Sequence, residues 1–201
     1  MDYKEWQFFG YDESNHGLFP EICVLSASNS SADVVPVFQT NPDGSLKLSD
    51  DNKPEPLLGK MRNDHSNLES RVENRDYSFL LFNYEDREKL FDYEKEIDYG
   101  YKKLGLIIAS LLYERRIKTP MGIYIDGEWH KKKIDYAVDL ISDLKSIPKD
   151  LIKVFYGAKL DRIFEVVNLS DELAHSFLPE LTFSYLRNHE KRVSLRMSEL
   201  L

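Results

Sequence analysis

The chain has 201 residues, of which 42% are hydrophobic and 12% aromatic, a composition that excludes a disordered protein and predicts one domain around one core. Its single cysteine, Cys23, excludes an intrachain disulfide framework and a cysteine-based zinc site. The net charge of −8 argues against a passive nucleic-acid binder, because such proteins use Lys and Arg to contact phosphates.

The start of the chain is charged and lacks the apolar region of a signal peptide. Nor does any apolar run approach the ~20 residues that a membrane-spanning helix needs. We therefore expect a soluble protein of the cytoplasm.

The first part of the chain predicts strands. They cover residues 6–11, 21–27 and 77–84, which are apolar runs bounded by turn residues. Residues 34–38 are interpreted as an edge strand or a strand extension, because Pro36 is not tolerated in a central strand. Residues from about 39 to 75 are polar and poor in periodicity. This excursion is interpreted as a long hairpin, a mobile flap or a small subdomain.

Helices and strands alternate in the second part. Helices are predicted over residues 85–116, in one or two pieces, and over 131–145, 163–177 and 181–201, with strands over 121–127 and 151–156. The resulting order is β-β-β-α-β-α-β-α. It predicts an α/β domain with a mixed sheet of about five strands flanked by helices, in which the later strands join through right-handed crossovers. Ligands are expected beyond the carboxyl ends of the parallel strands.

Acidic residues stand where these strands end. Asp12 and Glu13 follow the first strand, and Asp126 ends the strand over 121–127. If these two strands are neighbours, Asp126 lies beside Asp12. Asp161 and Asp171 follow the fifth strand. Carboxylates are the ligands that Mg²⁺ and Mn²⁺ prefer, and two such ions about 4 Å apart can activate a water and stabilise the leaving oxygen of a phosphodiester.

Each acid also has an ordinary interpretation. The pair Asp12-Glu13 is compatible with a solvated strand end, and Asp126-Gly127 is a common turn dipeptide. Asp171 is compatible with a helix cap or a first-turn acid. Asp161 is flanked by Lys159 and Arg162, which suggests a surface ion pair. The last ligand therefore remains open between Asp161 and Asp171, with Asp171 favoured.

Short motifs in the chain resemble the ribonuclease H-like superfamily. Asp12 to Gly17 resembles the Asp-Glu-Ala-Gly opening of ribonuclease HII, and Ile125-Asp126-Gly127 resembles its second acidic motif. Lys159-Leu160-Asp161, followed by the helical run from Val166, resembles its third. Ser170 to Ala174 is similar to the Ala-Asp-x-x-Ala motif of a broad uncharacterised microbial family of this fold that opens Asp-Glu-Ser-Gly. Ribonuclease HII reads the RNA–DNA junction with Gly-Arg-Gly, where this chain has Asn15-His16-Gly17, so the resemblance does not extend to junction recognition.

The resemblance implies a ribonuclease H-like domain that is a metal-dependent nuclease, cleaving phosphodiester bonds of DNA or RNA. Asp12, Glu13, Asp126 and Asp171 would hold Mg²⁺ or Mn²⁺ and act in catalysis, with Asp161 as the further candidate ligand. Lys131-Lys132-Lys133 and the basic residues of the last helix could contact the nucleic-acid backbone, or be solvated surface. The alternative is a non-catalytic module on the same fold that binds a protein partner through its helices and the excursion, which the negative net charge favours.

Overall fold

The computed structural model describes residues 6–14, 18–58, 75–94, 102–176 and 190–200. Its strands form one mixed 6-stranded sheet in the order β5-β4-β1-β2-β3-β6. They are β1 (Gln7–Ser14), β2 (Glu21–Ser28), β3 (Asp76–Phe82), β4 (Met121–Asp126), β5 (Ile152–Gly157) and β6 (Arg192–Val193). The first three form an antiparallel meander, whereas β4 and β5 run parallel to β1 on its other side. The predicted fold class is confirmed: the chain forms a mixed α/β sheet flanked by helices, which is consistent with a ribonuclease H-like fold.

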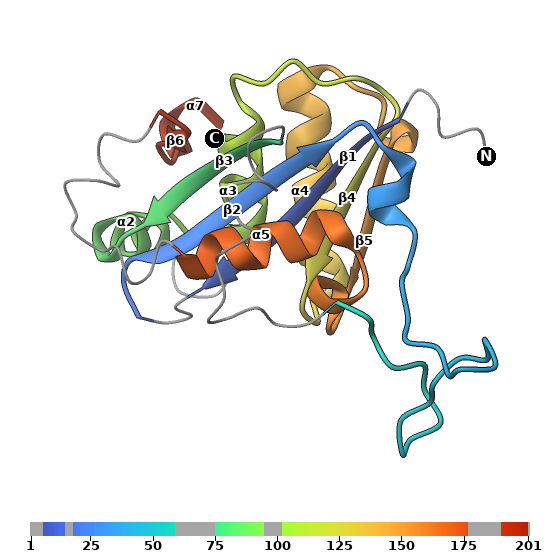
Figure 1. The fold of residues 1–201 in the computed structure, drawn as a ribbon. Coiled ribbons are helices and arrows are strands. Elements are labelled where there is room, and N and C mark those ends of the chain that lie inside the picture. The colour runs from blue at the N-terminus through green and yellow to red at the C-terminus, as the bar shows by residue number, and fades with distance from the viewer. Residues whose placement is uncertain (1–5, 15–17, 59–74, 95–101, 177–189, 201) are drawn as a thin grey trace.

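Helices cover both faces of the sheet (Figure 1). In this view α5 (Glu165–Ser176) lies in front of the sheet, and α3 (Lys103–Leu112) and α4 (Lys131–Lys145) lie behind it. The other helical elements are α2 (Tyr84–Glu94), α7 (Met197–Leu200) and the 3-10 turns η2 (Ser31–Val34), η3 (Lys149–Leu151) and η4 (Leu160–Arg162). A large apolar cluster fills the space between the sheet and α3 and α4, and two smaller clusters lie beneath α5.

The sequences of the helices explain their burial. α4 buries Ile134, Ala137 and Ile141, which are spaced three or four residues apart on one face. α3 is apolar on all sides, and every residue from Leu104 to Leu112 is buried because the helix packs against both the sheet and α4. Among the described residues, none of the helices has the length and apolar character to cross a membrane.

The predicted helix over residues 85–116 is present as two pieces, α2 and α3, and residues 95–101 between them lie outside the described part. The prediction of a helix over residues 181–201 is wrong for most of residues 190–200, the part of this range that the structure describes. Residues 192–193 form β6, and only Met197–Leu200 is helical. β6 runs parallel to β3, pairing Phe79 with Arg192. The backbone N–H and C=O groups at the edge of β3 thus form hydrogen bonds with β6. This pairing outweighs the helical pattern of residues 181–201.

The strand predicted over residues 34–38 is also wrong, because Ser31–Val34 forms η2 and only Phe38 makes an isolated bridge. Ser30 caps this turn by accepting the N–H of Ala32. Asp33, within the turn, binds the Ser28 hydroxyl at 2.5 Å and is paired with Arg75. These local bonds compete with a strand ladder.

Residues 37–58, which include the first part of the excursion predicted over about 39–75, form an arm that projects from the body of the domain (Figure 1). Bridges join Thr40 to Leu46 and Leu48 to Pro54, so the arm folds back on itself. Two backbone hydrogen bonds anchor it to the segment after β5: Val37 N–H to Ile163 O at 3.0 Å and Leu58 N–H to Arg162 O at 3.1 Å. Residues 59–74 of the excursion lie outside the described residues, and the single-domain organisation remains a prediction.

Candidate metal centre

Asp12 lies near the end of β1, on the face of the sheet that α5 covers. Side chains alternate along a strand, so Gly10 and Asp12 share this face while Tyr11 and Glu13 point to the other. Asp12 is only 8% exposed, and its Oδ1 accepts the backbone N–H of Glu13 at 2.8 Å. A carboxylate this far removed from water requires a proton or a nearby cation.

The helix α5 approaches β1 closely because Gly10 has no side chain. A Cβ at Gly10 would lie 2.1 Å from the backbone oxygen of Val166. Hydroxyl groups hold the helix in place: Ser170 Oγ donates to Gly10 O at 2.8 Å, and Ser26 Oγ donates to Val166 O at 2.6 Å. Further along, Ser14 Oγ donates to Ala174 O at 3.0 Å. The side of α5 that bears Asp171 is thereby fixed against the end of β1.

Asp126 stands at the end of β4, directly beside Asp12. Tyr11 pairs with Ile125, and the two aspartates are the next residues on adjacent parallel strands, as the sequence predicted. Asp126 Oδ1 accepts the N–H of Leu160 at 2.6 Å, which ties it to η4. Its backbone oxygen accepts Nε1–H of Trp129 at 2.8 Å.

Asp161 and Asp171 are both buried. Asp161 is therefore not the residue of a surface ion pair, and Asp171 is not a helix cap or first-turn acid. Asp161 lies in η4 and is 2% exposed, so it is not a surface residue. Asn168 Nδ2 donates to its backbone oxygen at 2.8 Å. Asp171 is 6% exposed and lies in the middle of α5, far from the helix start at Glu165, so it is not a helix cap.

The carboxyl group of Asp12 lies within reach of the charges of three other aspartates, Asp126, Asp161 and Asp171. Its pKa is raised from the ordinary value of 3.8 to about 9. Burial is the largest cause, followed by the negative charges of Asp171 and Asp126, with a smaller contribution from Asp161. The hydrogen bond from Glu13 N–H opposes this rise. The fold has therefore gathered Asp12, Asp126, Asp161 and Asp171 at the carboxyl ends of β1 and β4, and we call them the aspartate group.

The structure places Glu13 apart from the aspartate group, on the opposite face of β1. Its Oε2 accepts the hydroxyl of Tyr11 at 2.7 Å. Burial lowers the pKa of Lys103, but the charge of Glu13 and the hydrogen bond to Glu21 raise it more. Burial and then the charge of Glu13 raise the pKa of the Cys23 thiol. The Glu13 carboxylate therefore belongs to a polar cluster with Tyr11 and Lys103 beneath α3.

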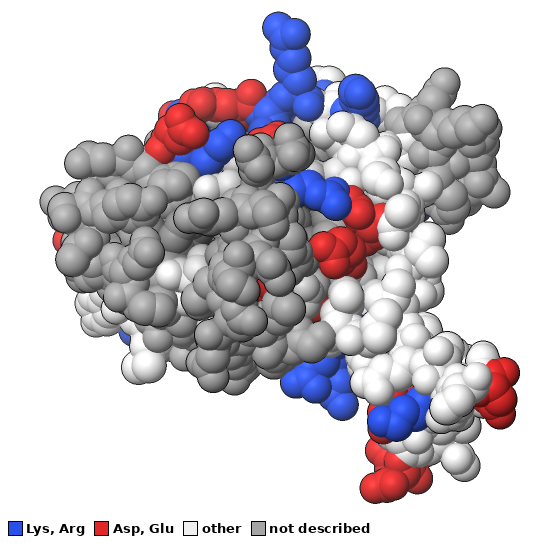
Figure 2. Space-filling model, viewed as in Figure 1, with Lys and Arg blue, Asp and Glu red and all other residues white. Residues whose placement is uncertain are grey.

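The side chains of the aspartate group are near one another without forming a closed cage. Among the residues that the structure describes, no group of three or more His, Cys, Asp or Glu side chains is arranged to hold a metal ion. Figure 2 shows, on the face that α5 covers, acidic side chains near the middle with basic ones scattered around them. On this face the described Lys and Arg residues form no continuous basic surface.

His175 also lies in this region, although the sequence analysis did not propose it as a site residue. Its Nε2 lies 3.2 Å from Oδ1 of Asp171, one turn earlier on α5. The signal was present, because residues four apart on a helix face each other and Asp171 and His175 have this spacing. His130 instead caps α4, accepting the N–H of Lys132 on Nδ1 at 3.2 Å. His16, His65 and His189 lie outside the described residues.

The basic residues considered for nucleic-acid contact have several different surroundings. Lys133 lies over the ring of Trp129, 5.7 Å from its centre, next to the end of β4. Arg196 pairs with Glu114 and Glu199, so its charge is largely neutralised. Arg192 lines a pocket at the end of β3, and Arg187 lies outside the described residues.

No family model matches the chain, and no curated protein matches it. Among solved structures it is similar to the ribonuclease H2 from Pyrococcus horikoshii OT3, with 16% sequence identity and a TM-score of 0.48 over 90% of this chain and 76% of that chain.

Proposed function

We propose that this protein is a metal-dependent nuclease, in which the aspartate group holds Mg²⁺ or Mn²⁺ and phosphodiester bonds of nucleic acid are cleaved. The observation that carries the proposal is the position of Asp12, whose burial beside Asp171 and Asp126 raises its pKa to about 9. Like charges buried together are costly unless a cation or protons neutralise them. A divalent cation would replace the proton of Asp12 and pair with the neighbouring carboxylates.

The chemistry of the donor set fits such an ion. Carboxylate oxygens are hard ligands, and sites with few protein ligands leave positions for water and phosphate oxygens. The similarity of Asp12-Glu13-Ser14 and of Ser170 to Ala174 to motifs of ribonuclease HII and of the microbial family supports the same role. When bound, the metal would supply an activated water and stabilise the leaving oxygen.

The residues of the chain would bind the metal ion and orient its ligands. Asp12 and Asp126 would bind the ion from neighbouring strands, and Asp171 would approach it from α5. The bond from Leu160 N–H leaves one oxygen of Asp126 for the ion. His175 would orient Asp171 through its contact at 3.2 Å. Asp161, buried in η4, is the further candidate ligand, whereas Glu13 faces Tyr11 and is not included.

The proposal is tested by titrating the protein with Mn²⁺ in a calorimeter and by incubating it with labelled DNA, RNA and hybrid. Asp126→Asn should abolish Mn²⁺ binding and cleavage. Asp135→Asn is the matched control, because Asp135 is exposed on α4 and its side chain makes no hydrogen bond or ion pair within the described part of the chain. Unchanged Mn²⁺ binding in Asp126→Asn would exclude this metal site.

A second candidate function, the binding of a protein partner, is favoured by the surface of the arm. Leu46 and Leu48 are each 49% exposed and Leu57 is 54% exposed, which is unusual for leucine on one projecting segment. Replacing Leu46 and Leu48 by Ser would then remove cross-links to a partner in a native extract. An unaltered cross-linking pattern would exclude the arm as the binding surface.

A further inference from the structure

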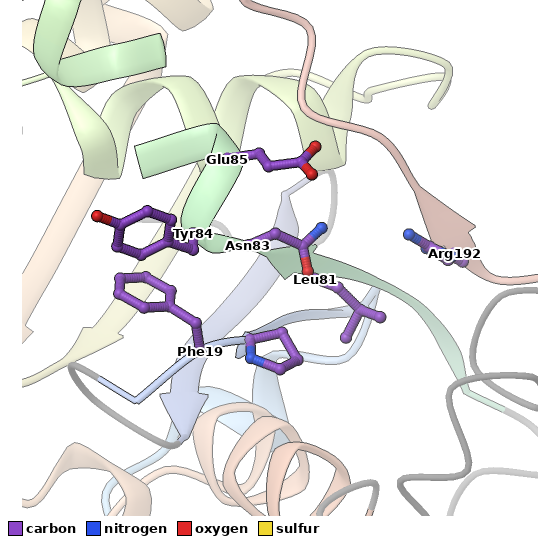
Figure 3. Close-up of a pocket in the computed structure, with 7 residues that line it drawn as sticks. Phe19, Leu81, Asn83, Tyr84, Glu85 and Arg192 are labelled. Carbon is purple, nitrogen blue, oxygen red and sulfur yellow. The ribbon is translucent and has the colours of Figure 1, made fainter. Parts of the chain in front are cut away.

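A pocket of about 340 Å³ opens beyond the end of β3, outside the aspartate group (Figure 3). This volume lies within the range of roughly 300–1,000 Å³ for small-ligand pockets. Phe19, Pro20 and Tyr84 form much of its apolar wall, and Asn83, Glu85 and Arg192 contribute polar groups. The combination of aromatic rings, a carboxamide and two opposite charges is suited to a ligand that is both flat and polar.

The aromatic wall is preformed. The rings of Phe19 and Tyr84 meet edge to face, with their centres 5.8 Å apart. The guanidinium of Arg87 lies over both rings, 5.9 Å from the centre of Phe19 and 5.7 Å from that of Tyr84. This contact holds the rings in place. Tyr84 is nevertheless 55% exposed, so part of its ring is available to a ligand.

The polar groups of the pocket are available as well. Within the described part of the chain, the side chains of Asn83, Glu85 and Arg192 make no hydrogen bond or ion pair. In Figure 3, Arg192 lies across the pocket from Phe19 and Tyr84, with the carboxamide of Asn83 between them. A ligand lying against the rings can therefore meet a carboxamide beside it and a cation at its far end.

The pocket and the aspartate group lie at the same edge of the sheet. Ile22 pairs with both Ser14 at the end of β1 and Leu81 near the end of β3. The strand spacing and the rise per residue place the pocket roughly 15 Å from Asp12. A chain of a few nucleotides could occupy both places at once.

We propose that this pocket binds one nucleotide of a single-stranded nucleic acid, with the base against Tyr84 and Phe19, its polar edge at Asn83 and Glu85, and a phosphate at Arg192. Bases of single strands stack on aromatic side chains and hydrogen-bond through their edges, whereas bases in a duplex are not accessible in this way. The inference rests on the proposed nuclease function and adds to it a preference for single strands.

The experiment uses a single-stranded DNA hexamer that carries one 2-aminopurine, titrated with the full-length protein in EDTA. Stacking on an aromatic ring should quench the 2-aminopurine fluorescence saturably. Tyr84→Ala should weaken binding at least about fivefold, since stacking of one base on an aromatic ring contributes this much or more. Arg192→Gln should weaken binding and reduce the slope of log affinity against log salt by about 0.7, as expected for one lost phosphate contact.

Matched controls are available for both variants. Tyr113→Ala removes a tyrosine that also lies beneath an arginine, Arg196, but outside the pocket. Arg116→Gln removes an exposed arginine that does not line the pocket. Both controls should bind the hexamer like the wild type. If Tyr84→Ala and Arg192→Gln also bind like the wild type, or if the controls weaken binding equally, the pocket is not the binding site.

Asp126→Asn separates this inference from the proposed function, because the titration in EDTA does not depend on a metal. This variant should bind the hexamer at least as tightly as the wild type while losing Mn²⁺ binding. If Asp126→Asn loses Mn²⁺ binding while Tyr84→Ala and Arg192→Gln bind the hexamer like the wild type, the pocket is not a nucleotide-binding site and the nuclease proposal stands. If Asp126→Asn retains Mn²⁺ binding while Tyr84→Ala and Arg192→Gln bind the hexamer more weakly, the proposed metal site is wrong and the pocket remains a nucleotide-binding site.

Discussion

Asp12 and Asp126 are side by side on two adjacent parallel strands, because the residues before them, Tyr11 and Ile125, are paired in the sheet. The chain separates them by more than half of its length, so only the parallel pairing of β1 with β4 unites them. Asp171 reaches the same place from α5, which Ser170 binds to Gly10 at 2.8 Å. Each of these contacts can be tested on its own.

Replacing Asp12 by Asn should stabilise the protein increasingly as the pH rises. The pKa of Asp12 is 3.8 in its ordinary state and about 9 in the fold, so the folded protein holds a proton that the unfolded chain releases between these values. The free energy of unfolding of the wild type therefore falls as the pH rises through this window. Asn cannot ionise, and its oxygen can still accept Glu13 N–H. Thermal unfolding from pH 5 to pH 8 without metal should show a growing advantage for Asp12→Asn over the wild type.

Asp135→Asn, at an exposed position, should show no such dependence on pH. A variant Asp12→Asn that is less stable than the wild type throughout would mean that Asp12 serves mainly as a structural hydrogen-bond acceptor.

Glu13→Gln should leave the affinity for Mn²⁺ within a factor of about two, well under 1.4 kcal/mol. The carboxylate of Glu13 accepts from Tyr11 at 2.7 Å and faces Lys103, on the other side of β1 from Asp12. The same substitution should change thermal stability, because it alters the charge balance around the half-buried Lys103. Calorimetric titration beside Asp126→Asn measures the difference. A loss of Mn²⁺ affinity comparable to that of Asp126→Asn would return Glu13 to the ligand set that the sequence predicted.

His175→Ala should weaken Mn²⁺ binding about tenfold, the lower end of what residues that orient metal ligands contribute. Its Nε2 lies 3.2 Å from Oδ1 of Asp171 and fixes the direction of that carboxylate. His175→Gln, whose amide can donate a hydrogen bond over a similar reach, should restore part of the affinity. His130→Ala is the control, since His130 caps α4 instead. Equal affinities of His175→Ala and the wild type would show that Asp171 needs no such partner.

Gly10→Ala should destabilise the fold by about 3 kcal/mol, the upper part of the usual cost of overpacking. The added Cβ would lie 2.1 Å from Val166 O, a backbone atom that can move only with α5 itself. Such a loss corresponds to a melting temperature lower by roughly 6–12 °C. Moving α5 also separates Asp171 from Asp12, so Mn²⁺ affinity should fall in the protein that remains folded.

Gly157→Ala is the matched control for Gly10→Ala, because the nearest atom to its Cβ is Cδ2 of the Leu160 side chain at 3.9 Å. It should leave the melting temperature within a few degrees of the wild type. Equal melting temperatures of Gly10→Ala and Gly157→Ala would mean that α5 has room to move away from β1.

The local pattern of the chain was sufficient for most of the secondary structure. Alternating and continuous apolar runs predicted the strands, and the spacing of Ile134, Ala137 and Ile141 predicted α4. The same reasoning failed for residues 192–193, where pairing with Phe79 and Leu80 on the edge of β3 outweighs a helical pattern. It failed again at η2, where Ser28 and Arg75 bind Asp33. In both places the deciding partners are distant in the sequence or specific to one geometry.

For the candidate site, the sequence by itself determined which acids end the strands, and hence that Asp12 and Asp126 belong at one edge of a sheet. Only the tertiary structure decided which other side chains join them. Strand alternation turned Glu13 towards Tyr11, whereas the close approach of α5 over Gly10 brought in Asp171 and His175. The burial of Asp161 was likewise decided by packing. The physical reason is that strand ends follow from local apolar patterns, while the direction and burial of a side chain depend on contacts that form only when the chain is folded.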